Sequence, residues 1–296
     1  MTPETASFST GPDEIPAYRR PADLPDFKNP PVSEVVLSVR FEPLSLEFVR
    51  LVVAAQELFS ADLPNPSQQP RLEMPIEDLS GLPVESIPRF ELVDTMPSPR
   101  LWCMSDSGDE LVQLQDDFFA RNWRRSDGSD AVYPHFEAVR SPFVHGLQEL
   151  QARLGGAEGL PIIPVQCEVT YVNTITGSGD RKIHSTLNRV LRIVGSMGDG
   201  FLPAAEGVQV SSQHLMRLDG GGEPFGRLHI SAQPAFRRSD KYPVVILTLT
   251  ARGPAVGRGL GGVVSFLDLG HEWIVRSFAE ITTDEMHAIW GRTDGR

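Results

Sequence analysis

The order of strand-like and helix-like segments constrains the fold of this chain more than any other feature of its sequence. Val35, Leu37 and Val39 alternate with other residues at the period of two that is typical of a half-buried strand. The next segment, 45–59, has apolar residues at helical spacing. Strand-like segments follow at 89–94, 100–106 and 110–119, and a helical segment spans 133–156.

A similar order returns in the second half of the chain. The strand-like segment 164–175 precedes a short helical segment, 185–195. Three further strand-like segments lie at 207–218, 226–236 and 243–251. The last two helical segments lie at 262–281 and 286–290. Strands that cluster between helices favour an α+β fold, in which helices cover one face of an antiparallel sheet.

The same pattern divides the chain into three predicted parts. Residues 1–26 are rich in Pro, Ser, Thr and acidic side chains, which indicates a disordered N-terminal arm. Residues 27–160 and 161–296 form two α+β halves, each with the order strand, helix, three strands, helix, joined in one continuous sheet. The general shape is similar to that of the TATA-binding-protein-like fold. Since the halves share a pattern more than their residues, an old duplication is compatible with the sequence but not established by it.

The composition of the chain limits which classes of partner it can bind and in which cellular compartment it is expected. The chain has 27 Lys and Arg against 39 Asp and Glu, a net charge of -12, which disfavours binding to the phosphates of nucleic acids. Apolar runs stay shorter than the roughly 18 residues of a membrane span, and the first residues lack the basic and apolar regions of a leader. We therefore expect a cytoplasmic protein. Cys103 and Cys167 lie in apolar strand-like segments, which predicts buried free thiols.

The stretch QLQDDFFARNWRR, residues 113–125, carries the first candidate site. Gln113 and Gln115 alternate with apolar residues, which predicts a strand with one face lined by amides. Beyond that strand, a charged turn, here called the basic rim, supplies three guanidinium groups, an amide and an indole, on Arg121, Asn122, Trp123, Arg124 and Arg125. This mixture suits a phosphate, a carboxylate or the acidic surface of a protein partner. The alternative is that Trp123 packs under the following helix and the arginines pair with surface carboxylates.

A second group of candidate residues lies in the strand-like segment 164–175. Tyr171 and Asn173 share one face of it, with Glu168 on the other. If the halves join edge to edge, Tyr171 and Asn173 extend the amide-lined face of residues 113–115 into a polar concave sheet surface. Glu168, Tyr171 and Asn173, together with Arg124, would also be the contacts for a ligand in the cleft between the halves. The alternative is an ordinary solvated sheet face.

Familiar catalytic and metal-binding motifs do not occur. The sequence has no H-E-x-x-H, G-x-S-x-G, Walker lysine or Cys-x-x-Cys motif. Gly257, Gly259 and Gly262 have the spacing of a dinucleotide-binding loop, but the segment after them predicts no second strand, which such a site needs. We therefore expect no cofactor and no metal site, and an enzyme is the less favoured class.

Several stretches together resemble an uncharacterised bacterial family, of roughly this length, that is distributed sporadically among genomes. They are NPPVSEVVLSVRFEPL, LVQLQDDFFARNWR, YPHFEAVRSPF, VTYVNTI and HEWIVRSFAEITTDEMHAIWG. The resemblance covers residues 27–291 and rests on the ordered set of motifs. It implies no established activity, and the sporadic occurrence is typical of mobile or accessory genes, including toxin–antitoxin and phage-defence cassettes.

Two functions follow as hypotheses. The favoured one is a non-enzymatic, acidic protein that binds another protein, in an antitoxin-like or defence-accessory role. The alternative is an enzyme or receptor for a small anionic or nucleotide ligand in the cleft between the two halves. A deep pocket that contains several candidate residues would favour the alternative, and a broad shallow face would favour protein binding.

Overall fold

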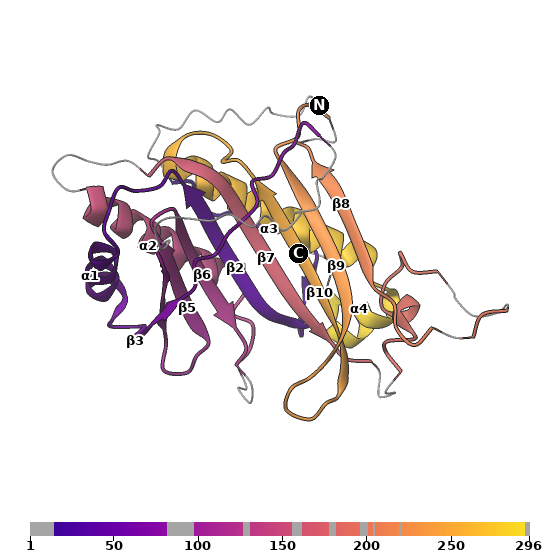
Figure 1. Cartoon of the computed structure of the whole chain (residues 1–296). Coiled ribbons are helices and arrows are strands. Elements are labelled where there is room, and N and C mark those ends of the chain that lie inside the picture. The colour runs from indigo at the N-terminus through magenta and orange to yellow at the C-terminus, as the bar shows by residue number, and fades with distance from the viewer. Residues whose placement is uncertain are drawn as a thin grey trace.

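A computed structural model describes residues 15–81, 98–126, 131–155, 162–177, 182–195, 201–203, 205–218 and 221–293. Nine strands of these residues form one antiparallel sheet, in the order β3-β4-β5-β6-β2-β7-β10-β9-β8. Figure 1 shows α2, α3 and α4 behind this sheet. The predicted α+β fold with helices on one face of an antiparallel sheet is therefore confirmed. No helix among the described residues is long and apolar enough to span a membrane.

The elements have the following bounds. The first half contains β1 (Asp26–Phe27), β2 (Val32–Phe41), α1 (Phe48–Phe59), β3 (Asn65–Gln69), β4 (Arg100–Met104), β5 (Glu110–Gln115), β6 (Phe118–Arg124) and α2 (Phe136–Gly155). The second contains β7 (Pro164–Ile175), a 3-10 turn (Leu187–Arg189), β8 (Val210–Met216), β9 (Gly226–Phe236), β10 (Pro243–Gly253), α3 (Gly259–Ile281), α4 (Asp284–Trp290) and β11 (Arg292–Thr293).

The core lies between the sheet and the helices. Phe119 of β6 is fully buried, stacks on Phe59 of α1 and packs against Phe143 of α2, with ring centroids 6.2 and 5.2 Å away. Such a ring stabilises the fold by about 1.5–3 kcal/mol through burial alone. In the second half of the sheet, α3 lies close to β7 because Gly270 has no side chain. A Cβ at this position would be 3.2 Å from a side-chain carbon of Val169. Both central strands thus contribute one face to a single core.

Three sequence-based predictions of elements differ from the structure. The predicted strand 110–119 is two strands, β5 and β6, joined by a turn at Asp116 and Asp117. The charged segment after it is part of β6 and not a turn. The predicted helix 185–195 is only a 3-10 turn. The predicted strand 89–94 lies outside the described residues.

Residues 15–26 of the N-terminal segment pack against the rest of the protein, although the sequence predicts order only from residue 27. Residues 1–14 of the expected arm lie outside the described residues, but Leu24 is fully buried and Tyr18 packs against the core. Arg140 of α2 donates a hydrogen bond to the carbonyl oxygen of Pro16 at 2.7 Å. β1 then pairs with β11, so the segment is held at both ends. The expectation of disorder is wrong for residues 15–26, because apolar residues in this polar stretch find buried positions.

Residues 71–81, here called the strap, cross the face of the sheet that is turned away from the helices. Figure 1 shows this segment in front of β2 and β7. Amide side chains of the sheet bind its backbone. Gln115 accepts from the Leu72 amide at 2.6 Å, and Gln166 accepts from the Glu77 amide at 2.7 Å. The strap has no strand period, and the sheet binds it through side chains instead of through a strand edge.

Candidate functional site

The residues of the predicted basic rim are bound within the β5–β6 hairpin and its neighbours. Arg121 forms an ion pair with Glu110, and Arg124 donates to the carbonyl oxygen of Gly108 at 2.9 Å. Trp123 is buried against Tyr133, with ring centroids 5.5 Å apart. The guanidinium groups of Arg121 and Arg124 therefore have partners in this hairpin and in the preceding β4–β5 turn, and the indole packs beside the start of α2, as the alternative interpretation held.

A groove passes this end of the hairpin, but its charge is not that of the predicted rim. The groove has a volume of about 640 Å³, and its lining includes three carboxylates, those of Asp62, Asp109 and Glu110. Arg121 is its one lysine or arginine among the described residues. These carboxylates disfavour an acidic partner surface at this groove. A recognition role for the basic rim stays a prediction.

The polar residues expected on one sheet face lie on two. Gln113 and Gln115 face away from the helices, with the strap, and Glu168 does so as well. Tyr171 and Asn173 point into the helix-covered face, since Tyr171 pairs in register with the buried Val35 and hydrogen-bonds to α3. The continuous polar concave surface predicted from these residues therefore does not exist.

On the strap face, Gln113 and Asn122 belong to a ladder of side-chain hydrogen bonds. Gln113 accepts from Trp102 Nε1 at 3.1 Å and donates to Asn122 Oδ1 at 2.8 Å. Asn122 in turn donates to Glu34 Oε1 at 2.7 Å. The ladder crosses four adjacent strands, so these amides stabilise the sheet through their partners in the chain itself.

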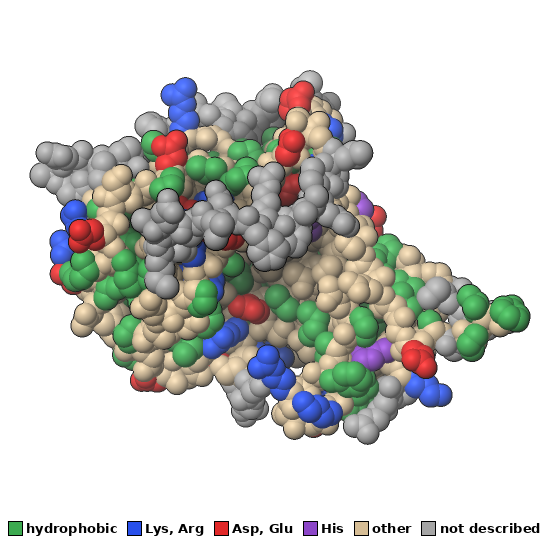
Figure 2. All heavy atoms as spheres, in the orientation of Figure 1, with side chains coloured by type: hydrophobic (Ala, Val, Ile, Leu, Met, Phe, Trp, Pro, Cys, Tyr) green, Lys and Arg blue, Asp and Glu red, His purple; other side chains and the backbone are tan. Residues whose placement is uncertain are grey.

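Ion pairs hold both ends of the strap. At one end Arg71 lies 2.8 Å from Asp117. At the other end, Glu77 lies 2.6 Å from Arg227 Nε, at an angle unsuited to a hydrogen bond, and 2.8 Å from His229 Nε2. Arg252 links this cluster to Glu168, whose carboxylate accepts from Arg252 Nε at 2.7 Å. Glu168 is therefore engaged by a cation of the same sheet face. Figure 2 shows that acidic and basic side chains are interspersed on this side of the molecule.

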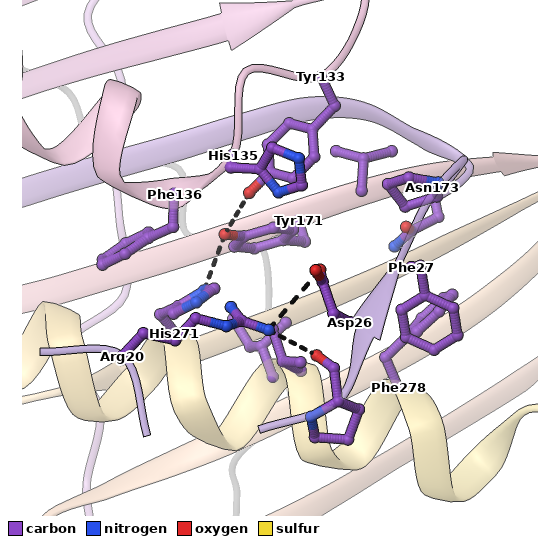
Figure 3. A pocket seen from close by; sticks show the side chains of 15 residues that line it. Arg20, Asp26, Phe27, Tyr133, His135, Phe136, Tyr171, Asn173, His271 and Phe278 are labelled. Atoms are coloured by element: carbon purple, nitrogen blue, oxygen red, sulfur yellow. Dashed lines mark hydrogen bonds and ion pairs between the residues drawn. The ribbon is translucent and has the colours of Figure 1, made fainter. Parts of the chain in front are cut away.

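A pocket on the helix side brings together two of the predicted residues. Tyr171 and Asn173 of β7 line it, together with rings from the N-terminal segment, from the start of α2 and from α3 (Figure 3). These rings are Phe27, Phe136 and Phe278. The cavity has a volume of about 50 Å³, room for a group of a few heavy atoms.

A chain of hydrogen bonds ends in this pocket. The Tyr133 and Tyr171 hydroxyl oxygens are 2.9 Å apart, and the Tyr171 oxygen is 2.8 Å from His271 Nδ1. The His271 ring stacks on Phe136, with parallel planes and centroids 4.0 Å apart. Burial, helped by the charges of Arg20 and His135, lowers the pKa of His271 to about 3, so the imidazole is neutral at physiological pH. Burial also raises the pKa of both tyrosines above 10.

One nitrogen of this Tyr133–Tyr171–His271 hydrogen-bond chain is left without a partner. His271 Nε2 is buried and makes no hydrogen bond to any described residue. An orphaned buried donor or acceptor costs about 1–3 kcal/mol, and native structures contain few of them. The atom therefore marks a place where the pocket lacks a polar group.

Two further residues give the pocket a mixed electrostatic character. Arg20 donates to the carbonyl oxygens of Leu24 and Pro25 at 3.2 and 2.9 Å and lies 3.7 Å from Asp26. Figure 3 shows its guanidinium group between His271 and Asp26. His135, on the opposite wall, has a left-handed backbone with φ of 67°, a strained conformation for a residue other than glycine.

Comparisons of the chain with protein-family models, curated proteins and solved structures find no match. The resemblance to a sporadically distributed bacterial family stays a prediction, as does the similarity to the TATA-binding-protein-like shape. The described residues contain no group of three or more His, Cys, Asp or Glu that could hold a metal ion.

His271 lines the pocket but is not among the site residues predicted from the sequence. The signal was present, because His271 lies four residues after Leu267 and three before Ile274, both buried on α3. Tyr171 likewise continues the buried series of Cys167 and Val169 on β7. A polar residue in phase with a buried stripe indicates a buried polar group, and such groups need partners.

Proposed function

We propose that this protein is a receptor for a small ligand, which binds in the pocket between β7, α3 and the N-terminal segment. The observation that supports this function is the pocket itself, in which aromatic walls surround a few convergent polar groups. This is the alternative hypothesis drawn from the sequence, with Tyr171 and Asn173 retained as lining residues. Glu168 and Arg124 are not among the lining residues, so we assign them no contact with the ligand.

The test is to fill the pocket with one extra ring. Val275 of α3 lines the cavity, so Val275→Phe occupies the space of the ligand. The matched control is Val49→Phe in α1, because Val49 is 59% exposed and distant in sequence from the pocket. Binding of benzoate, benzamide and benzyl alcohol is measured by chemical-shift titration of the protein. We expect at least one probe to bind the wild type and the control, and none to bind Val275→Phe. Equal binding to all three proteins would refute the pocket as the site.

The favoured hypothesis from the sequence, an antitoxin-like or defence-accessory role in binding another protein, stays a prediction. Its supports have changed, because the strap covers part of the amide-lined sheet face and the predicted rim has internal partners. A cytoplasmic location also stays a prediction, and the two free buried cysteines are compatible with it.

We also propose that the two halves arose by duplication of one unit, with boundaries near residue 160. The support is the strand order. From the central strand β2 the neighbours run outward as β6, β5 and β4, and from the adjacent β7 they run outward as β10, β9 and β8. Each half then has the same connectivity around its own central strand. In this arrangement the ligand pocket lies on the β7 side of the junction.

A further inference from the structure

The unpartnered nitrogen of His271 indicates the chemical class of the ligand. We infer that the pocket binds a small carboxylic acid with an apolar body, whose carboxylate accepts a hydrogen bond from His271 Nε2 and faces Arg20. This inference rests on the proposed function, since it concerns the same pocket.

The first step is the direction of the hydrogen-bond chain. If Tyr133 donates to Tyr171 and Tyr171 donates to His271 Nδ1, both hydroxyl protons are used and the imidazole proton is on Nε2. In the reverse direction, the Tyr133 proton has no acceptor among the described residues, and Nε2 is also unpaired. The first direction leaves one unsatisfied group and the second leaves two. The pocket therefore presents an N–H donor, and its ligand must supply an acceptor oxygen.

The second step is the charge around this donor. Arg20 lies on one side of the pocket, and its Nη2 atom is used by backbone carbonyl oxygens. Asp26, the one carboxylate among the described residues of the lining, is 3.7 Å from that guanidinium group, so the two charges partly offset each other. An anionic acceptor is favoured over a neutral one beside this N–H donor, since hydrogen bonds to charged groups are about twice as strong.

The third step is size and shape. The volume of about 50 Å³ suits a carboxylate and not a whole aromatic molecule. The body of the ligand must then extend beyond this volume and lie against Phe27 and Phe278, which pack edge to face with ring centroids 5.3 Å apart. These rings offer apolar surface to an aromatic or aliphatic chain. A short acid with one apolar end fits both parts of the site.

The experiment compares head groups on one ring. Chemical-shift titrations with benzoate, benzamide and benzyl alcohol give a Kd for each probe with the wild type, His271→Phe, Arg20→Gln and Arg19→Gln. His271→Phe keeps a ring on Phe136 but removes the N–H. Arg19 is exposed and adjacent in sequence to Arg20, so Arg19→Gln controls for the change in net charge. Thermal unfolding confirms that each variant is folded.

We expect the wild type to bind benzoate more tightly than either neutral probe. His271→Phe should weaken benzoate binding about tenfold or more, while the binding of benzyl alcohol stays unchanged. Arg20→Gln should weaken benzoate binding several-fold, and Arg19→Gln should not. If the neutral probes bind as well as benzoate and Val275→Phe blocks them all, the carboxylate inference is wrong and the pocket function stands. If benzoate keeps its advantage in both His271→Phe and Arg20→Gln, the inference is also wrong. If no probe is sensitive to Val275→Phe, the receptor function itself fails.

Discussion

Replacement of Glu77 by Gln tests whether the strap is anchored as the ion pairs indicate. The Glu77 side chain is only 8% exposed, and its main partner, Arg227, is 4% exposed. Glu77→Gln removes the anion and leaves a buried guanidinium group whose acceptors among the described residues are the carbonyl oxygens of Asp78 and Gly81. Removal of one partner of a buried pair typically costs about 3–5 kcal/mol.

The loss should fall at the lower end of that range. The strap can detach locally and let water reach Arg227, and the free energy of this opening limits the cost. We therefore expect the free energy of unfolding to fall by about 3 kcal/mol, which corresponds to a decrease in Tm of roughly 6 °C for a chain of this size. Urea denaturation gives the first quantity and calorimetry the second. Hydrogen exchange at the Glu77 amide, which is bound to Gln166, should become faster in the variant.

Glu73→Gln is the matched control on the same strap. Glu73 lies 3.4 Å from Arg71, but its side chain is 81% exposed, so its removal should change the free energy of unfolding by less than about 0.5 kcal/mol. Equal effects of the two substitutions, or an unchanged exchange rate at residue 77 in Glu77→Gln, would show that the strap does not depend on this ion pair.

Other measurements probe the core, the pocket and the cysteines. Burial raises the pKa of both thiols, that of Cys103 to about 11. A disulfide reagent at neutral pH should therefore react slowly with Cys103 and Cys167 in the native protein, and quickly with both in denaturant. A thiol that reacts quickly in the native protein would contradict this. The unfolded protein binds a proton at His271 below pH 6.5, whereas the folded protein binds it only near pH 3. The free energy of unfolding should therefore decrease as the pH is lowered through this window, by up to about 1.4 kcal/mol per pH unit. In His271→Phe the urea midpoint should depend less on pH between pH 4 and 6. Gly253→Ala should cost about 1–3 kcal/mol, since its Cβ would lie 2.5 Å from a backbone oxygen, whereas Gly195→Ala, with no atom within 4 Å, should be neutral in the same assay.

The regular part of the fold could be predicted from the sequence because its periods are strong. β7 and β9 coincide with the predicted segments 164–175 and 226–236, and α3 extends the predicted helix 262–281 by three residues at its start. The free, buried state of both cysteines is also confirmed. In these segments local pattern and tertiary burial agree, so a single sequence is sufficient.

The hairpin was missed because its turn carries only part of the usual local signal. Asp116 and Asp117 are turn-forming residues, but no glycine, asparagine or proline stands beside them. What stabilises it is Arg71, which lies near both carboxylates but some 45 residues earlier in the chain. A partner so distant leaves no mark on the local pattern. The same holds for the strap, whose backbone partners are side-chain amides of remote strands.

Only part of the pocket was predicted from the sequence, because the strand face that carries Tyr171 and Asn173 was assigned to the wrong side of the sheet. Tyr171 and Asn173 were singled out correctly as residues on one face of a strand, but the face was assigned to solvent. Tyr171 follows Cys167 and Val169 at intervals of two, and these two are fully buried, so the apolar phase of β7 already assigned it to the core. The N-terminal wall of the pocket, including Arg20, has no period at all and depends on contacts that form only in the folded protein.

The strap also has a consequence for the order in which the protein is made. Glu77 is 152 residues ahead of His229, and its other partners, Arg227 and Arg252, also belong to the last strands to be synthesised. At the usual pace of about 5–20 residues per second, these cations follow the strap from the ribosome by roughly 8–30 s. During that interval the carboxylate has no partner at this end, and β2 lacks β7 along one edge. The nascent first half is thus an open sheet with a loose strap, which is the state most exposed to mispairing. Fusion proteins that end between β6 and β7 should therefore be the least soluble fragments of this chain.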